Sequence, residues 1–228
     1  MSVITDEKNW SDFKNFQSDE IRSHIKNKYD DKKIKNFLKR LRDSYINLVI
    51  IYQNIEIIRL LHKLERNLIS SKECENMPVL CNLQLIDFSV TRSLSLSLFS
   101  IYENDGINIK EIINFIIKNN NELKDDNEIY IEKLIETHES KKHLSDQIEI
   151  LRKFRNNCLA HNDISDNENI KFPVYDDIFK ATDHTLSYTL NCMKILTTRK
   201  IDTMEDFFEK SKIRIREFEK FLKKYPLQ

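Results

Sequence analysis

The clearest pattern in the chain is a run of apolar residues between Asp31 and Asn67 that alternates spacings of four and three. On an α-helix, these spacings place apolar side chains along one stripe. The members of the stripe are Ile34, Leu38, Leu41, Tyr45, Leu48, Tyr52 and Ile55. The pattern predicts a long helix over about 31–67 with a coiled-coil-like seam, typical of a helical bundle.

Similar patterns predict further helices. Residues 79–102 form a more thoroughly apolar segment, which indicates a helix at the centre of the bundle. Asn108 followed by Glu111 has the form of a capping box that opens a short helix over 107–119. The other predicted helices are a long charged one at about 126–160 and two more at about 175–198 and 203–225.

Composition supports an all-α fold. The 228 residues include a single glycine and three prolines, and the turns between strands could hardly be built from so few. We expect one up-and-down bundle of about five or six helices, forming a single helical domain over residues 1–228. The last helix, about 203–225, carries charges on every side and is expected to be a C-terminal appendage.

The net charge of the chain does not indicate a nucleic-acid partner. The 37 Lys and Arg residues balance 37 Asp and Glu residues, so an RNA would have to be held by a local patch. Two basic clusters could steer phosphates, although a solvated helix face is the favoured interpretation of each. The clusters comprise Lys32, Lys33, Lys35, Lys39, Arg40 and Arg42, and residues 210–216.

Several site chemistries are disfavoured. The six histidines include no pair at i and i+4, and the four cysteines include no C-x-x-C pair, so we expect no metal, no cofactor and reduced thiols. Cys158 lies within a turn of His161 but belongs to the apolar stripe of its helix, which favours a core role over a nucleophile. The longest apolar run, residues 48–52, is too short to span a bilayer, and the N-terminus lacks the features of a signal peptide. We therefore expect a cytoplasmic protein.

Residues 151–163, LRKFRNNCLAHND, contain the candidate site. On an ideal helix Leu144, Ile148, Phe154, Cys158 and Leu159 fall within about 80° of Leu151, and Arg155 falls at about 40°, inside the same apolar stripe. A guanidinium there requires an anion, a carboxylate or a solvated cleft. One interpretation is structural: Arg155 pairs with a carboxylate such as Glu149 or Asp87, and His161 caps the last carbonyls of the helix.

The other interpretation comes from the string Arg155-Asn156-(x)3-Ala160-His161-x-Asp163 at the end of a long amphipathic helix. This string resembles the motif of the HEPN superfamily of small helical nucleases, in which an arginine and a polar residue precede a histidine by four to six positions. The chain looks closest to the U-type abortive-infection branch of bacterial HEPN proteins, in which a helix like residues 94–116 precedes such a segment. The resemblance covers roughly residues 34–198.

The resemblance implies a HEPN-like bundle and a metal-independent RNA endonuclease of a toxin or anti-phage defence type. Arg155 and His161 would be catalytic, with Asn156 and Asp163 supporting them. It further implies a homodimer whose two motif segments line one cleft, with RNA as substrate and an antitoxin or defence-system protein as a further partner. The alternative function is a non-catalytic helical dimer that binds nucleic acid or a protein partner.

Overall fold

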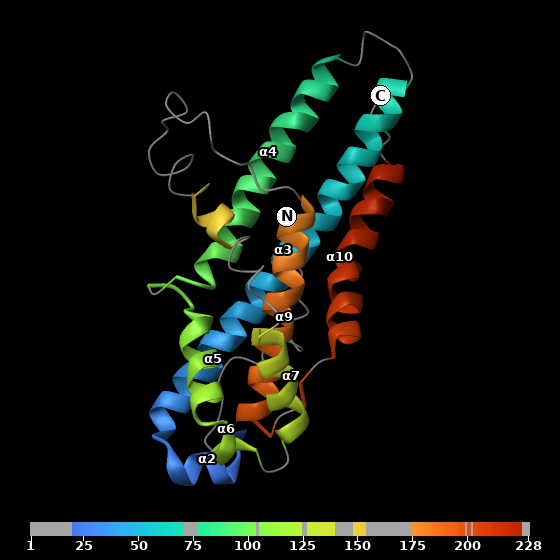
Figure 1. Ribbon diagram of the computed structural model, residues 1–228. Helices are drawn as coiled ribbons and strands as arrows, with labels where there is room; N and C mark the ends of the chain where they lie inside the picture. Colours follow the sequence, from blue (N-terminus) through green and yellow to red (C-terminus); the bar gives the residue numbers. More distant parts are fainter. Residues whose placement is uncertain are drawn as a thin grey trace. The chain divides into compact units, whose positions relative to one another are not determined.

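A computed structural model describes residues 20–70, 77–103, 105–124, 127–139, 148–153, 175–198, 200–201 and 203–224. These residues are predominantly helical and contain no β-strand, apart from an isolated antiparallel bridge between Ile21 and Thr197 (Figure 1). The predicted all-α fold is confirmed. The long helices are α3 (Asp31–Ser70), α4 (Met77–Ser100), α5 (Ile109–Lys118), α7 (Glu128–Glu139), α9 (Tyr175–Leu196) and α10 (Met204–Lys224).

Two short helices were not predicted: α2 (Ser23–Lys28) and α6 (Asn120–Leu123). They have six and four residues, too few for a helical period to stand out in the sequence. Residues 148–153 are also helical. The predicted continuous helix over 126–160 includes residues outside the described ones, so its continuity stays a prediction.

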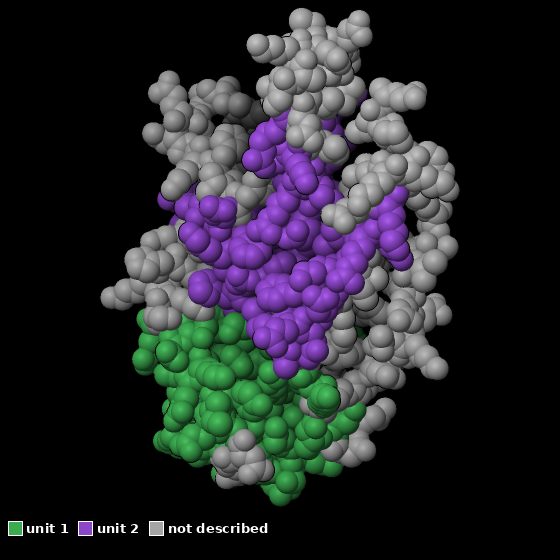
Figure 2. All heavy atoms as spheres, turned by 90° about the vertical axis from the view of Figure 1, so that its right-hand side faces the viewer, with its two compact units in different colours: residues 1–46, 101–140, 186–202 green, residues 47–100, 141–185, 203–228 purple. Residues whose placement is uncertain are grey.

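The described chain divides into two compact units (Figure 2). Unit 1 comprises residues 1–46, 101–140 and 186–202, and unit 2 comprises residues 47–100, 141–185 and 203–228. Helices α3 and α9 contribute to both units.

The seam of α3 is buried as predicted. All seven members of the stripe from Ile34 to Ile55 are buried, and the same face continues through Ile58 and Leu61. The register of this helix could be predicted from sequence because a stripe of four-and-three spacing has only one way to face a core.

In unit 1, the first part of α3 packs on α5 through an aromatic cluster. The ring of Phe115 makes edge-to-face contacts with Phe37 and Tyr29, with centroids 5.2 and 5.0 Å apart. Lys33 lies over the Phe115 ring, with its Nζ 4.8 Å from the centroid. Ser44 of α3 and Thr189 of α9 share a buried hydrogen bond of 2.9 Å.

The start of α5 differs from the capping box predicted from Asn108 and Glu111. Asn108 is the N-cap residue, but it adopts a left-handed conformation (φ 50°, ψ 56°) and its side chain makes no capping hydrogen bond. Arg40 of α3 stabilises this turn instead: its guanidinium donates to the carbonyl oxygens of Ile107 (2.5 Å) and Asn108 (2.6 Å) and to Glu111 (2.8 Å). The capping-box prediction was therefore wrong, because a long-range arginine occupies the carboxylate that the local pattern assigned to the cap.

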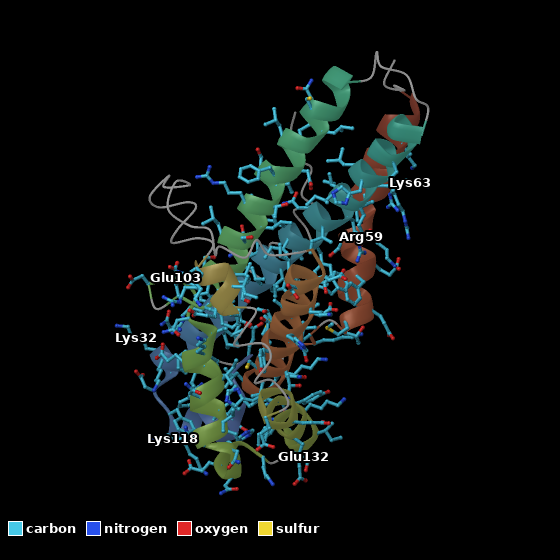
Figure 3. All side chains as sticks on the ribbon, turned by 45° about the horizontal axis from the view of Figure 1, so that its top comes forward. Lys32, Arg59, Lys63, Glu103, Lys118 and Glu132 are labelled. Carbon is cyan, nitrogen blue, oxygen red and sulfur yellow. The ribbon has the colours of Figure 1, made fainter. Side chains whose placement is uncertain are left out.

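In unit 2, α10 lies beside the second half of α3 (Figures 1 and 3). Tyr52 of α3 makes edge-to-face contacts with Phe207 and Phe208 of α10 and with Phe179 of α9, at centroid distances of 5.1 to 5.7 Å. Thr203 and Asp206 form a reciprocal capping box at the start of α10: the Thr203 amide donates to the Asp206 carboxylate (3.0 Å), and the Asp206 amide donates to the Thr203 hydroxyl (3.1 Å).

Helix α4 is less buried than its composition predicts. Leu83, Leu94, Leu98 and Phe99 are buried, whereas Leu85, Ile86, Phe88 and Leu96 are exposed. The prediction that this helix is central to the bundle is therefore wrong for one of its faces.

Candidate functional site

The four predicted site residues, Arg155, Asn156, His161 and Asp163, lie outside the described residues. Their assignment to chemistry stays a prediction, and so does the alternative pairing of Arg155 with a carboxylate. The structure does describe the helical residues that directly precede them, and other titratable groups of unit 2.

Residues 148–153 show the register on which the motif was placed. Ile148 and Leu151 are buried, in agreement with the predicted apolar stripe, and Arg152 and Lys153 are exposed. The Arg152 guanidinium donates two hydrogen bonds to the Glu149 carboxylate, at 2.7 and 2.6 Å. These bonds raise the pKa of Arg152 and keep its side chain on the outer side of the helix.

One imidazole among the described residues of unit 2 lies close to a carboxylate. Nε2 of His62, on α3, lies 3.2 Å from Oδ2 of Asp87 on α4, and about a third of each side chain is exposed (33% and 29%). The His62 carbonyl accepts a hydrogen bond from Arg66 Nε at 3.3 Å, and the Asp87 carbonyl accepts one from the Thr91 hydroxyl at 2.9 Å. A carboxylate in this position can fix the orientation of the imidazole ring.

Sequence reasoning did not find this pair. Its members are 25 positions apart on two helices, so neither helix carries a local pattern that includes both. To predict this pair from the sequence, one would have to know how α3 and α4 are aligned against each other, and that alignment depends on tertiary packing.

Asp183 of α9, in unit 2, lies in an environment that disfavours its charged form. Burial raises its pKa from 3.8 to about 6. Its Oδ1 is buried, and no donor in the described part of the chain reaches it. An aspartate with this pKa changes its charge close to neutral pH.

The basic cluster on α3 is largely occupied by contacts within unit 1. Lys33 covers the Phe115 ring, Arg40 holds the turn before α5, and Lys35 and Arg42 pair with Asp31 and Asp43. Lys32 is exposed and points away from the helices (Figure 3). These contacts favour the structural interpretation of the cluster over phosphate steering.

The cluster on α10 is partly neutralised. Glu209 lies 3.0 Å from Lys212 and 3.2 Å from Arg216, and both cations lower its pKa. Side chains of Lys210 and Arg214 are outside the described ones.

Thiol chemistry is unsupported by the cysteines whose side chains are described. Cys192 is fully buried, and this burial raises the pKa of its thiol. Cys81 is exposed on α4. Cys74 and Cys158 lie outside the described residues.

Among the described residues no three His, Cys, Asp or Glu side chains gather closely enough to hold a metal ion. None of the described helices is both long and apolar enough to cross a membrane.

No protein-family model, curated protein or solved structure matches the chain.

Proposed function

We propose that the protein is a metal-independent RNA endonuclease in which a ribose 2′-hydroxyl attacks the adjacent phosphate. The observation that carries the proposal is the string Arg155-Asn156-(x)3-Ala160-His161-x-Asp163. Two described features support it: the all-α fold, and the helical register of residues 148–153 with Ile148 and Leu151 buried. This register is the one from which Arg155 was predicted to lie at the apolar side of the helix.

The chemistry suits these residue types. An imidazole with a pKa near neutrality can take the proton of the 2′-hydroxyl, and a second imidazole can give a proton to the departing 5′-oxygen. The new bond joins the 2′-oxygen to phosphorus, and the bond from phosphorus to the 5′-oxygen breaks. The products are a 2′,3′-cyclic phosphate and a 5′-hydroxyl.

Each motif residue has a separate role in this proposal. Arg155 stabilises the negative charge that develops on the phosphoryl oxygens, because its planar guanidinium offers several donors at once. Asn156 orients the phosphate or the imidazole, and Asp163 holds the imidazole in one tautomer. Two copies of the chain contribute their motif segments to one cleft, which supplies both imidazoles.

The biological setting proposed is a toxin or an anti-phage defence system in the cytoplasm, with an antitoxin or defence-system protein as partner. Sequencing the genes on either side tests this setting, since such a nuclease is expected to have a gene for an antidote or a defence protein beside it.

The test of the reaction uses the purified full-length chain and a single-stranded RNA in EDTA. Cleavage should persist, because 2′-hydroxyl attack needs no metal-activated water, and it should spare DNA and 2′-O-methylated RNA. The rate should vary across roughly pH 5.5–8, where an imidazole titrates. Magnesium dependence, DNA cleavage or 5′-phosphate products would refute this mechanism.

Variants then assign the residues. Arg155→Ala and His161→Ala should each abolish cleavage while leaving the melting temperature nearly unchanged. Arg152→Ala is the matched control, because this neighbouring arginine is exposed and pairs only locally with Glu149, and it should cleave like the wild type. RNA binding without cleavage by the wild-type protein would instead favour the non-catalytic dimer.

A further inference from the structure

One face of α4 is exposed and almost uncharged. Among the residues of α4 whose side chains are described, nine are exposed, and a single one of them, Arg92, carries a charge. The nine cover one side of the helix, within an arc of about 160° at 100° per residue. This α4 face comprises Cys81, Asn82, Leu85, Ile86, Phe88, Ser89, Arg92, Ser93 and Leu96.

Helix α10 of the same unit shows what a solvent-facing helix in this chain looks like. Its described exposed residues are all charged: Glu205, Asp206, Glu209, Lys212, Arg216, Glu217 and Lys220. A helix surface that stays in water is normally polar, and depletion of charge is typical of the centre of a protein interface. The α4 face therefore has the composition of a covered surface.

The apolar area on this face matches the core of a dimer interface. Leu85, Ile86, Phe88 and Leu96 are 65, 46, 53 and 39% exposed, equivalent to two fully exposed large side chains. Such side chains present roughly 150–200 Å² each, so the face offers on the order of 350 Å² of apolar surface. A standard interface buries about 800 Å² per partner, of which somewhat more than half is apolar. One copy of the α4 face would thus supply most of the apolar part of such an interface.

We propose that the α4 face is covered by the α4 face of a second copy of the chain, with the two helices antiparallel. A two-fold symmetric pair buries both faces at once, and the same patch serves both partners. Antiparallel packing follows from charge: a parallel pair would set the two Arg92 guanidinium groups side by side and align the helix dipoles. An antiparallel pair centred on Ser89 separates the two Arg92 positions by about 9 Å along the axis.

The residue pattern of α4 also supports an alignment of the two antiparallel helices that is centred on Ser89. Asn82, Leu85, Ser89, Arg92 and Leu96 follow the alternating three-and-four spacing of a helix–helix seam. Ser89 lies at the middle of the seam, where its small side chain lets the two backbones approach. The aliphatic part of Arg92 then packs against Leu85 and Ile86 of the second copy, while its guanidinium reaches solvent at the rim.

This interface does not rest on RNA cleavage. The proposed function also uses two copies, but it names the segments that include Arg155 and His161 as the facing ones. The α4 face is a separate surface, so either proposal can fail while the other holds.

Sedimentation equilibrium of the full-length protein tests the interface. The wild type should associate at micromolar concentration, as a dimer through the α4 face alone or as a larger assembly when the motif segments also pair. Leu85→Glu combined with Phe88→Glu should remove the α4 step of this association, raising the dissociation constant of that step by at least 100-fold. Ile129→Glu on α7 is the matched control, because Ile129 is 64% exposed but lies in unit 1, and it should leave the dissociation constant unchanged. A monomeric wild type, or a double variant that associates as strongly as the wild type, overturns the proposal.

Cross-linking tests the antiparallel register. Cys81 and Leu96 lie at opposite ends of the α4 face, so an antiparallel pair brings Cys81 of one copy close to position 96 of the other. Under mild oxidation, Leu96→Cys should form covalent dimers, and Leu96→Cys combined with Cys81→Ser should lose them. Efficient cross-linking of the wild type that Cys81→Ser abolishes would show a parallel pair and overturn the register.

Discussion

Replacing Asp183 by asparagine should stabilise the protein at neutral pH and have little effect in acid. Burial raises the pKa of this carboxyl group from 3.8 to about 6 in the folded state, so the folded chain binds the proton more tightly than the unfolded chain does. The stability that this proton contributes is fully present below pH 3.8 and is lost as the pH rises through about 6. Above that pH, the folded protein carries a charge that would be better solvated in the unfolded chain.

The magnitude follows from the size of the change in pKa. Taken in full, a shift from 3.8 to about 6 corresponds to about 3 kcal/mol. The group is only half-buried, so solvent screening reduces the expected penalty to about 1–2 kcal/mol. Asparagine has nearly the same volume and no charge, so Asp183→Asn should recover most of this free energy at pH 7.5.

Urea denaturation at pH 4 and pH 7.5 measures the effect. We expect Asp183→Asn to raise the free energy of unfolding by about 1–2 kcal/mol at pH 7.5, which corresponds to roughly 2–8 °C in melting temperature for a chain of this size. At pH 4 the variant and the wild type should be nearly equal. Glu217→Gln, an exposed carboxylate change on α10, is the control and should show no such difference between the two pH values. An equal gain at both pH values, or none at pH 7.5, would refute the desolvation argument.

Two further predictions concern the packing of the units. Arg40→Ala should lower the free energy of unfolding by about 2–3 kcal/mol, because the side chain is 16% exposed and donates to two carbonyls and Glu111. In the same urea titration, Arg40→Lys should recover less than half of this lost free energy, since an ammonium group cannot reproduce the guanidinium fork. Tyr52→Phe should raise the free energy of unfolding by about 0.5–1 kcal/mol, because the buried Tyr52 hydroxyl has no hydrogen-bond partner among the described residues. A loss of more than 1 kcal/mol for Tyr52→Phe would contradict this account.

Helices α4 and α10 differ in the kind of side chain that they expose. On α10 the exposed side chains that the structure describes are charged, and the buried ones, such as Phe207 and Ile215, recur at helical spacing. On α4 apolar side chains occupy both the buried and the exposed faces. A helix that is apolar all round indicates that it is covered, but composition does not say whether the same chain or another covers it. The α4 variants described above distinguish burial by the same chain from burial by a second copy.

The sequence alone determined the fold class and most helix positions. The stripe from Ile34 to Ile55 predicted both α3 and its buried face, because helical periodicity is a local property and apolar side chains at that period have one favourable placement. The motif that includes Arg155 and His161 is equally a local pattern and could be recognised without coordinates, although its chemistry stays a prediction.

Only the tertiary structure decided which distant side chains meet. His62 and Asp87 come together because α3 and α4 pack in one particular register, and Arg40 reaches the carbonyls before α5 from 67 and 68 positions away. Among the described residues, the same packing left Asp183 without a donor and four apolar side chains of α4 exposed. Local periodicity sets which face of a helix is apolar, but the choice of partner for that face depends on interactions summed over the whole fold, which no single segment encodes.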